Sequence, residues 1–511
     1  FFEPMVKLIL QYENKQVVRT TRMGSIQSLL LHLTGSDTKK KFALASMRGI
    51  VGNYSPEVRE EIIQKLGGIL GEKLAFLSYF DEKQGAVVPY KPVVGEGRDN
   101  CVLTTYVQAN LSIIMKVFEA AQTIVIVGPE GGGKNTILRR ALTQLGTTTK
   151  VKTVTLHCNS QTSAQQVISL LLDSCLRSST STGPILRPKD CTRLVVFLRD
   201  VNLAKPDEYQ STELINFLQQ IHSHRGFYDD ELEFTQLDKN VQFVISMNPS
   251  SDIGRHELST RLTACTHILF IDYPSKEDMK TIVKHMVEDA LARGTFTAPL
   301  LKSRPAHAEN IATLLQEVFS TVKATFTPEQ QKHYIFTPKD ISSILDSVLL
   351  YEVETIDELN QALMQEINLT FKARLTRPEE ISKFEGALRK AASALSSGGS
   401  RDIVFTSLIK KDQQLSKTTM AGYQECLARG LLAFQREHLE NEVCFTEQFV
   451  ELIQTMDKIL SRPGGKALLI GSSGSGRKMC TQLLSHMLNI EFETFSPGKG
   501  YSLKEFRKEL R

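Results

Sequence analysis

The chain has 511 residues, enough for roughly three or four folded units, and its 41% apolar and 23% charged residues describe an ordinary globular protein. Its 61 basic and 57 acidic residues leave a net charge of +4, which is too slight over this length to indicate binding to nucleic acid or to an anionic membrane. Eight scattered cysteines without a C-x-x-C pair argue against a disulfide framework or a zinc site and favour a reducing compartment, and no apolar run approaches the roughly 18 residues that a membrane span needs.

The first segment, residues 1–90, is predicted to be helical. Its stretches "MGSIQSLLLHL" and "SPEVREEIIQKLGGIL" carry apolar residues at helical spacing. The chain starts without an initiator Met or a signal-peptide pattern and stops in the helical pattern "FRKELR". We therefore expect an excerpt from a longer protein.

Residues 100–275 alternate short apolar strands with longer polar or helical stretches. Each strand is rich in β-branched residues, which is typical of a parallel sheet covered on both faces by helices. The sequence therefore predicts an α/β unit with a five-stranded parallel sheet. The expected strands are 123–127, 153–157, 194–198, 242–246 and 267–271.

The rest of the chain holds a helical subdomain and the start of a repeat. Residues 276–395 carry helical apolar stripes, and 396–440 are expected to be a linker or helical connection, with the flexible stretch "ALSSGGSRD" at 394–402. Within 441–511, "KALLIGSSGSGRKMCTQLLSHML" repeats the strand, glycine loop and helix of the first unit, 343 residues further on. The chain should therefore hold parts of three similar modules.

The stretch "GPEGGGKN" has the spacing of a phosphate-binding loop, G-x-x-x-x-G-K-[ST]. Glycines let successive backbone N–H groups approach phosphate oxygens, and the following helix adds its positive N-terminus. Asn stands where a Mg²⁺-binding hydroxyl is expected, so Asn135 is only a weak metal candidate; the alternative is a glycine turn that binds nothing. The expected nucleotide-binding residues are Gly128, Pro129, Glu130, Gly131, Gly132, Gly133, Lys134, Asn135 and Thr136.

Polar residues at the ends of later strands are candidates for catalysis. A nucleotide hydrolase needs one acid to support Mg²⁺ and a second to orient water, but "LVVFLRDVN" places Arg199 in the first position and the short acid Asp200 in the second. We interpret this as a degenerate pair, although the two charges could simply end a strand. Asn248, in "SMNP", is a candidate sensor of the γ-phosphate, or else a turn residue before proline.

Further basic residues are candidates for contacts with phosphate. Arg255 and Arg261 precede the fifth strand, where an arginine can project into a neighbouring module. Arg261 is the preferred candidate for this role, and the alternative is that it is an ordinary surface arginine. Lys339 begins a later helix and is either a second phosphate sensor or a solvated lysine. The second loop has arginine in the lysine position, so it should bind weakly or serve structure. Its residues are Gly471, Gly474, Gly476, Arg477 and Lys478.

Together these motifs resemble an AAA+ module, and the linking segments resemble dynein heavy chains. The segments that carry the resemblance are "TGPILRPKDCTRLVVFLRDVNLAKPD", "FLQQIHSHRGFYDD" and "SMNPSSDIGRHELSTRLTACTHILFIDYPS". The branch resembled most is the cytoplasmic type 2 heavy chain, the retrograde motor of intraflagellar transport. By this resemblance the chain covers the end of the second module, the whole third module with its helical lid, and the start of the fourth.

The resemblance implies a segment of an ATP-driven, minus-end-directed microtubule motor in the cytoplasm and cilium. The third module would be a regulatory site for ATP or ADP, with Mg²⁺ only as a candidate metal and neighbouring AAA+ modules of the same chain as its partners. Microtubules and accessory chains would be reached only through parts outside this chain. Asn135 and Lys339, which stands where many dynein modules have arginine, weaken the case for rapid turnover.

Two alternatives remain at this point: a ring segment of another AAA+ remodelling ATPase of the midasin type, and an inert scaffold whose nucleotide never turns over. The midasin type should lack a hairpin at "GFYDD". We also expect the chain to hydrolyse poorly by itself. The arginine finger for its site would come from the fourth module, about 127 residues beyond Arg477 by the Lys134-to-Arg261 spacing, whereas the chain stops at Arg511.

Overall fold

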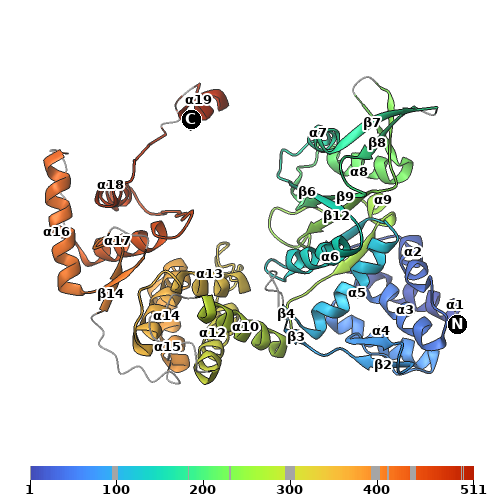
Figure 1. Ribbon diagram of the computed structural model, residues 1–511, viewed down its shortest axis with the longest axis horizontal. Coiled ribbons are helices and arrows are strands. Elements are labelled where there is room, and N and C mark those ends of the chain that lie inside the picture. Colours follow the sequence, from blue (N-terminus) through green and yellow to red (C-terminus); the bar gives the residue numbers. More distant parts are fainter. Residues whose placement is uncertain are drawn as a thin grey trace. The chain divides into compact units, whose positions relative to one another are not determined.

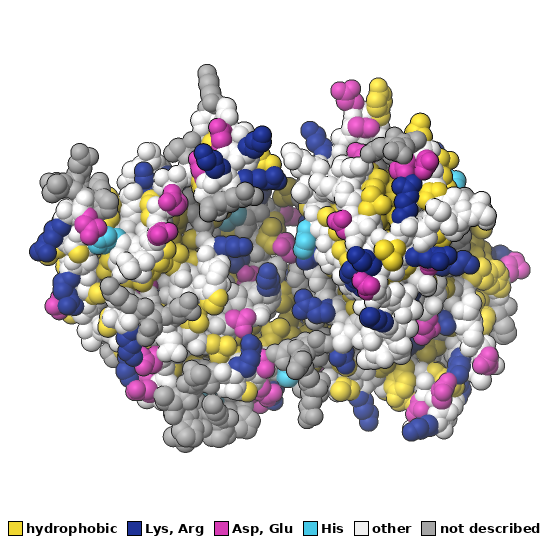
Figure 2. Space-filling model, turned by 45° about the horizontal axis from the view of Figure 1, so that its top comes forward, with side chains coloured by type: hydrophobic (Ala, Val, Ile, Leu, Met, Phe, Trp, Pro, Cys, Tyr) yellow, Lys and Arg dark blue, Asp and Glu magenta, His cyan; other side chains and the backbone are white. Residues whose placement is uncertain are grey.

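The computed structural model divides into two compact units, Phe1–Ile282 and Val283–Arg511 (Figure 1). Among the residues that it describes, no helix is both long and apolar enough to cross a membrane. Basic and acidic side chains are interspersed on the face drawn in Figure 2, in keeping with the small net charge. The described residues are 2–94, 102–181, 183–229, 232–293, 305–392, 403–410, 414–437, 445–495, 498 and 500–510.

The first segment is a helical bundle, as the sequence predicts, and it ends in a hairpin that was not expected. The side chain of Thr21 caps the second helix and that of Thr38 the third, while Gly71, in the left-handed region, ends the fourth. The elements are α1 (Phe2–Gln11), η1 (Glu13–Lys15), α2 (Arg22–Leu33), α3 (Lys39–Val51), α4 (Pro56–Leu70), and the antiparallel pair β1 (Ser78–Asp81) and β2 (Ala86–Pro89).

The main sheet of the first unit has five parallel strands in the order β13-β5-β12-β9-β6, and all five predicted strands are confirmed. This order brings the carboxyl ends of β5, β12 and β9 to adjacent places on one edge. The strands are β5 (Ile124–Val127), β6 (Val151–His157), β9 (Arg193–Arg199), β12 (Val241–Met247) and β13 (His267–Phe270).

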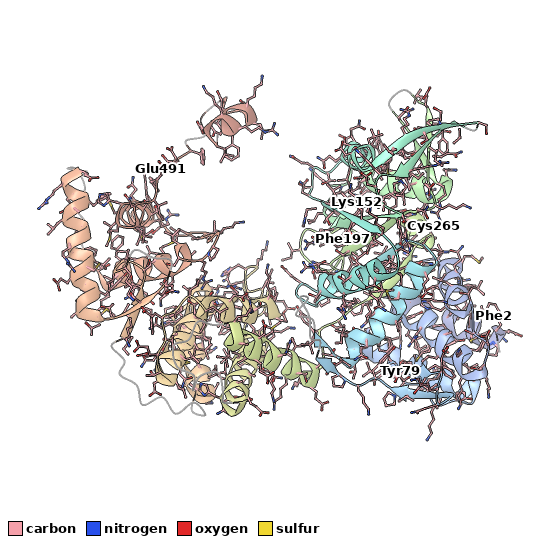
Figure 3. All side chains as sticks on the ribbon, in the orientation of Figure 1. Phe2, Tyr79, Lys152, Phe197, Cys265 and Glu491 are labelled. Atoms are coloured by element: carbon pink, nitrogen blue, oxygen red, sulfur yellow. The ribbon has the colours of Figure 1, made fainter. Side chains whose placement is uncertain are left out.

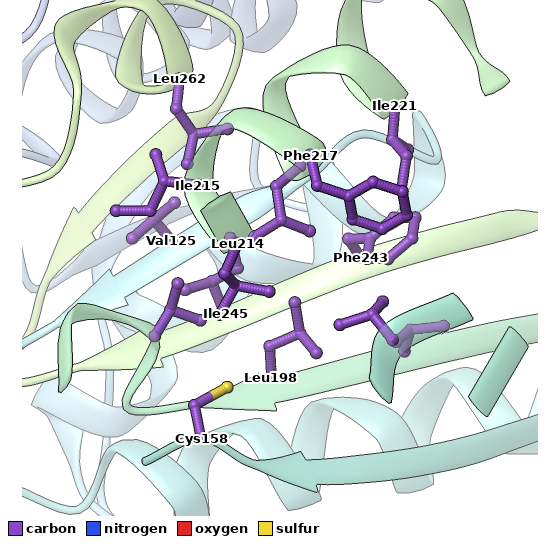
Figure 4. Packing of buried hydrophobic residues seen from close by; sticks show 14 of the residues in the cluster. Val125, Cys158, Leu198, Leu214, Ile215, Phe217, Ile221, Phe243, Ile245 and Leu262 are labelled. Carbon is purple, nitrogen blue, oxygen red and sulfur yellow. The ribbon is translucent and has the colours of Figure 1, made fainter. Parts of the chain in front are cut away.

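Helices cover both faces of this sheet because successive residues of a buried strand point to opposite sides. On β5, Ile124 and Ile126 pack with α5 (Thr105–Glu119) and α6 (Lys134–Thr148), while Val125 and Val127 pack with α7 (Ala164–Ser174) and α8 (Glu213–His224). Figure 4 shows the second cluster, in which side chains of α8 lie over those of β5, β9 and β12. Figure 3 shows Lys152 on β6, Phe197 on β9 and Cys265 after the short α9 (Thr260–Ala264).

A second, four-stranded sheet in the order β10-β11-β8-β7 was mostly missed from the sequence. Only its hairpin at "GFYDD" was expected, and the antiparallel pairing of the two strands there confirms it. The other two strands were not predicted, since their alternation of polar and apolar residues is weak. The strands are β7 (Cys175–Thr180), β8 (Gly183–Pro188), β10 (Gly226–Tyr228) and β11 (Phe234–Leu237).

The second unit begins as a helical subdomain, as predicted. Reciprocal capping boxes start two of its helices, through Thr337 with Asp340 and Thr355 with Glu358. The helices are α10 (Lys276–Arg293), which begins in the first unit, α12 (Pro305–Thr325), α13 (Pro338–Val348), α14 (Ile356–Thr370) and α15 (Pro378–Ala392).

The repeat that follows forms only in part. The stretch 394–402, which was predicted to be flexible, lies outside the described residues; after it, two antiparallel strands within 403–419 are followed by a helix. The expected strand at "KALLI" is wrong for this structure: these residues are not in a strand, and Leu468 and Ile470 are 86% and 85% exposed, because the part of the chain that is described offers them no strand to pair with. The elements are β14 (Ile403–Thr406), β15 (Ser416–Thr419), α16 (Met420–Glu437), α17 (Glu447–Leu460), α18 (Arg477–Leu488) and α19 (Leu503–Glu509).

Candidate nucleotide-binding site

The phosphate loop runs from the end of β5 to the start of α6, and its backbone needs glycine at three places. Gly131 and Gly133 have φ of 75° and 82°, in the left-handed region that disfavours other residues. Gly133 is also the N-cap of α6. A Cβ on Gly128 would lie 2.0 Å from the carbonyl oxygen of Ile271, so only glycine fits beside β13. This shape leaves the N-terminus of α6 and the loop amides available to an anion.

Lys134 is folded back onto its own loop. Its Nζ donates to the carbonyl oxygens of Gly128 and Pro129, and to the side-chain Oδ1 of Asn248 at 2.7 Å. Burial lowers the pKa of Lys134 to about 8, while the carboxylates of Asp200 and Asp252 oppose that change. The ammonium therefore sits among neutral oxygens, ready to exchange them for phosphate oxygens.

Asn248 follows β12, the strand next to β5, and is 8% exposed. Its side chain accepts from Lys134, and its main-chain oxygen accepts from Nδ2 of Asn202 at 2.9 Å. Both ends of Asn248 are thus held, and the structure brings this expected sensor residue against the expected lysine.

Asp200 directly follows β9 and is paired with an arginine of its own module. It lies in the left-handed region, with φ of 59°, which aspartate tolerates better than most residues. Nη1 of Arg255 donates to its Oδ1 at 2.8 Å, and the Arg255 side chain is only 14% exposed. Arg255, considered from the sequence as a residue that projects outward, is instead engaged within the site. Arg199, the last residue of β9, is half-buried.

The donor set fits a phosphate better than it fits Mg²⁺. The glycine cradle and Lys134 suit an anion, whereas the metal side is incomplete. Asn135 and Thr136 are exposed on the first turn of α6, and Asp200, the acid that follows β9, is already bound by an arginine. Across the described residues, no group of three or more His, Cys, Asp or Glu side chains could hold a metal ion.

Arg261 is not brought to this cluster, because it is exposed on α9, a helix that contacts α2. Lys339 lies at the start of α13, as expected, and belongs to the second unit.

The second loop repeats the first in its backbone. Gly474 and Gly476 have φ of 84° and 77°, matching the glycines 343 residues earlier. Nη2 of Arg477 donates to the carbonyl oxygen of Ser472 at 3.2 Å, as Lys134 does to that of Pro129. Gly471 and Lys478 are exposed. The loop geometry thus forms even where the preceding strand does not.

Sequence reasoning missed two contacts at the site. The hydroxyl of Tyr273 donates to the carbonyl oxygen of Glu130 at 2.6 Å, and burial, with help from nearby acids, raises the pKa of this phenol to about 12. The other is the ion pair of Asp200 with Arg255. The only sequence signals are "FIDYP" after β13 and "GR" after β12, and neither spacing specifies a partner.

Comparison with known families assigns three parts of the chain. Residues 97–274 match the P-loop containing dynein motor region, residues 294–381 match the dynein heavy chain ATPase lid domain, and residues 442–511 match the P-loop containing dynein motor region D4. These matches favour the dynein interpretation over a ring of the midasin type.

Relatives of known name align with most or all of the chain. Cytoplasmic dynein 2 heavy chain 1 of Chlamydomonas reinhardtii is 30% identical, covering 100% of this chain and 12% of the relative. Cytoplasmic dynein 2 heavy chain 1 of Homo sapiens is 29% identical, and the alignment covers 100% of this chain and 13% of the relative. A cytoplasmic dynein heavy chain of Dictyostelium discoideum is 27% identical, covering 76% and 8%. The chain spans about an eighth of the length of the first two relatives, and with its AAA P-loop modules and ATPase lid it belongs to the dynein heavy-chain family.

Proposed function

We propose that residues 100–390 bind an adenine nucleotide, ATP or ADP, through the loop from Gly128 to Thr136. The observation that carries this proposal is the convergence of Lys134 and Asn248 beside a loop whose glycines hold left-handed conformations. In the absence of phosphate, the lysine is satisfied by neutral oxygens of the loop and of Asn248. A phosphate would supply charged oxygens in their place, and charge-assisted hydrogen bonds are roughly twice as strong as neutral ones.

The same site is proposed to hydrolyse ATP slowly or not at all, which suits a regulatory module. Three features support this. The metal-binding hydroxyl is replaced by Asn135, a cation at Arg199 stands where a metal-supporting acid is expected, and Asp200 is neutralised by Arg255 at 2.8 Å. An acid whose oxygen already accepts from an arginine has less capacity left to accept a hydrogen bond from an attacking water. Mg²⁺ remains a candidate ion of the site only through Asn135.

At the level of the whole protein, we propose a segment of the motor ring of a cytoplasmic type 2 dynein heavy chain. The names of the Chlamydomonas reinhardtii and Homo sapiens relatives, each a cytoplasmic dynein 2 heavy chain 1, support this assignment. Neighbouring AAA+ modules of the same chain would be its direct partners, and its place would be the cytoplasm and the cilium. Minus-end-directed movement on microtubules and retrograde intraflagellar transport would belong to the complete protein.

The proposal is tested by measuring binding and turnover separately on the purified chain. A fluorescent ADP analogue should bind to the unaltered chain, and Lys134→Ala should weaken that binding by a factor of ten or more, about the effect of losing one charged hydrogen-bond donor. Arg140→Ala, on the same helix as Lys134 and beyond its first turn, is the matched control and should bind normally. Equal affinity of Lys134→Ala and the unaltered chain would remove the loop from consideration.

Turnover is followed in the same samples with ATP under single-turnover conditions. We expect bound nucleotide with almost no product. Robust hydrolysis that Lys134→Ala abolishes would contradict the proposal of a slow site. Tight binding without product would support it, because the bound nucleotide would then act by stabilising one conformation of the module.

A further inference from the structure

The helical segment before the nucleotide-binding unit contributes one deeply buried cation, Arg59 on α4. It is 3% exposed, and its guanidinium donates to three main-chain oxygens and also interacts with the Tyr106 hydroxyl. Nε donates to Val51 at 3.1 Å, and Nη2 donates to Gly52 at 3.1 Å and to Phe270. The guanidinium carbon also lies 4.9 Å from the centroid of the Phe76 ring. Arg59 therefore joins the helical segment to the last residue of β13.

β13 is an edge strand, and its open edge faces this helical segment. The N–H of Phe270 donates to the carbonyl oxygen of Gly52 at 2.8 Å, while the carbonyl oxygen of Phe270 accepts from Arg59. Both polar groups of Phe270 are thus held by residues 52–59. The end of the strand cannot move without breaking contacts to that segment.

Two of the three residues after Phe270, Ile271 and Tyr273, contact the phosphate loop. The N–H of Ile271 donates to the carbonyl oxygen of Val127 at 2.7 Å, and its own carbonyl oxygen lies where a Cβ on Gly128 would be. Two residues on, the Tyr273 hydroxyl donates to the carbonyl oxygen of Glu130 at 2.6 Å. Between these contacts, the N–H of Asp272 donates to the Tyr106 hydroxyl at 3.0 Å. The stretch 270–273 is therefore a short strap, with Arg59 at one end and the loop at the other.

We propose that Arg59 is a positioning residue that couples the helical segment 1–90 to the phosphate loop through the strap 270–273. Burying a guanidinium costs desolvation free energy, and apolar side chains of similar size often give equal or greater stability in a core. Its planar fork, however, can hold several carbonyl oxygens at fixed angles, which lysine or an apolar residue cannot do. A shift of the helical segment would pull on the oxygen of Phe270 and would reach Gly128 and Glu130 within three residues. The affinity for nucleotide would then depend on the position of that segment.

This inference rests on the proposed nucleotide site, so its test has one arm that needs no nucleotide. Amide hydrogen exchange is compared in the unaltered chain, Arg59→Met and Arg48→Met, without added ligand. Arg48 lies in the same helical segment and also donates to a main-chain oxygen, that of Ser78 at 3.2 Å, but it does not touch the strap. We expect faster exchange in peptides covering 128–133 for Arg59→Met only. Unchanged exchange there would overturn the inference, whether or not nucleotide binds.

The second arm measures the affinity for the ADP analogue in a double-mutant cycle with Tyr273→Phe, which removes the far end of the strap. Each single change should weaken binding roughly fivefold, within the range seen for residues on a coupling path. The double variant should be little worse than either single one. If the affinity losses of the two single variants multiply in the double variant, the two residues act independently and a shared path is contradicted. A lower melting temperature of Arg59→Met without a change in its affinity would also contradict the inference.

If Arg59→Met does not fold, Arg59→Lys replaces it, since lysine keeps the charge and loses the fork; normal loop exchange in Arg59→Lys would then overturn the inference. If the chain binds no nucleotide at all, the proposed function is wrong. The proposed role of Arg59 is still tested in that case, because the hydrogen-exchange experiment needs no nucleotide.

Discussion

Raising the pH should weaken nucleotide binding at this site, because it titrates Lys134. Burial lowers the pKa of that ammonium to about 8 in the free site. In the complex, phosphate oxygens favour the charged form and keep the lysine protonated well above that value. Binding thus takes up a proton when the free lysine is neutral, and the apparent dissociation constant grows in proportion to 1 + 10^(pH − pKa).

The size of the effect follows from that pKa. Between pH 7.5 and pH 9 the factor rises from about 1.3 to about 11, an increase of about eightfold in the dissociation constant. Cys158 and Tyr273 do not titrate in this interval, because burial raises the pKa of each to about 12. The nucleotide phosphates are already ionised above pH 7.5, so their charge stays constant.

The assay is a fluorescence titration with the ADP analogue in EDTA, at five pH values from 7.5 to 9.5. Lys134→Arg is the matched control, since a guanidinium keeps its charge throughout this range. It should bind with an affinity that does not change with pH. A flat profile for the unaltered chain, or an equal decline in Lys134→Arg, would refute the assignment of the effect to this lysine.

Two further predictions concern turnover and stability. In a complete ring, the combined change Asn135→Ser, Arg199→Asp and Asp200→Glu should raise ATP turnover at this module, because it supplies the metal-binding hydroxyl and acids that are missing; an unaltered module that turns over ATP as fast as the triple variant would contradict the degenerate-site interpretation. Acid should destabilise the first unit through two histidines: burial, aided for His32 by the charge of His267, lowers their pKa from 6.5 to about 3 for His32 and about 4 for His267. The unfolded chain then binds more protons below pH 6.5, so stability is lost as pH falls from about 6.5 toward 4, by about 2 kcal/mol per histidine between pH 7 and 5. Urea unfolding should show this loss, and His32→Gln with His267→Gln should flatten it; an equal slope in that variant would refute the assignment.

The sheet and the loop were predictable because their signals are local. A run such as "TIVIV" is buried on both sides wherever it sits in a parallel sheet, and the glycines after it have backbone angles that few other residues adopt. The same holds for the second loop, whose glycines reach matching angles although the strand before it does not form. The strand at "KALLI" failed for a different reason, since a strand needs a neighbour and a local pattern cannot show whether one is present.

The sequence alone determined the elements that local chemistry controls: five strands, the capped helices, the glycine loop and the position of Lys134 at the start of a helix. It also placed Asp200 and Asn248 at strand ends, and the parallel pairing of β9 and β12 brings these two ends to the same edge of the sheet. Only the tertiary structure decided which charges meet. Arg255 lies 55 residues from Asp200, and Arg59 lies 211 residues from Phe270, yet each pair is in contact. Such partners are set by the packing of whole helices against the sheet, and a long, flexible arginine carries no local signal of where its guanidinium will end.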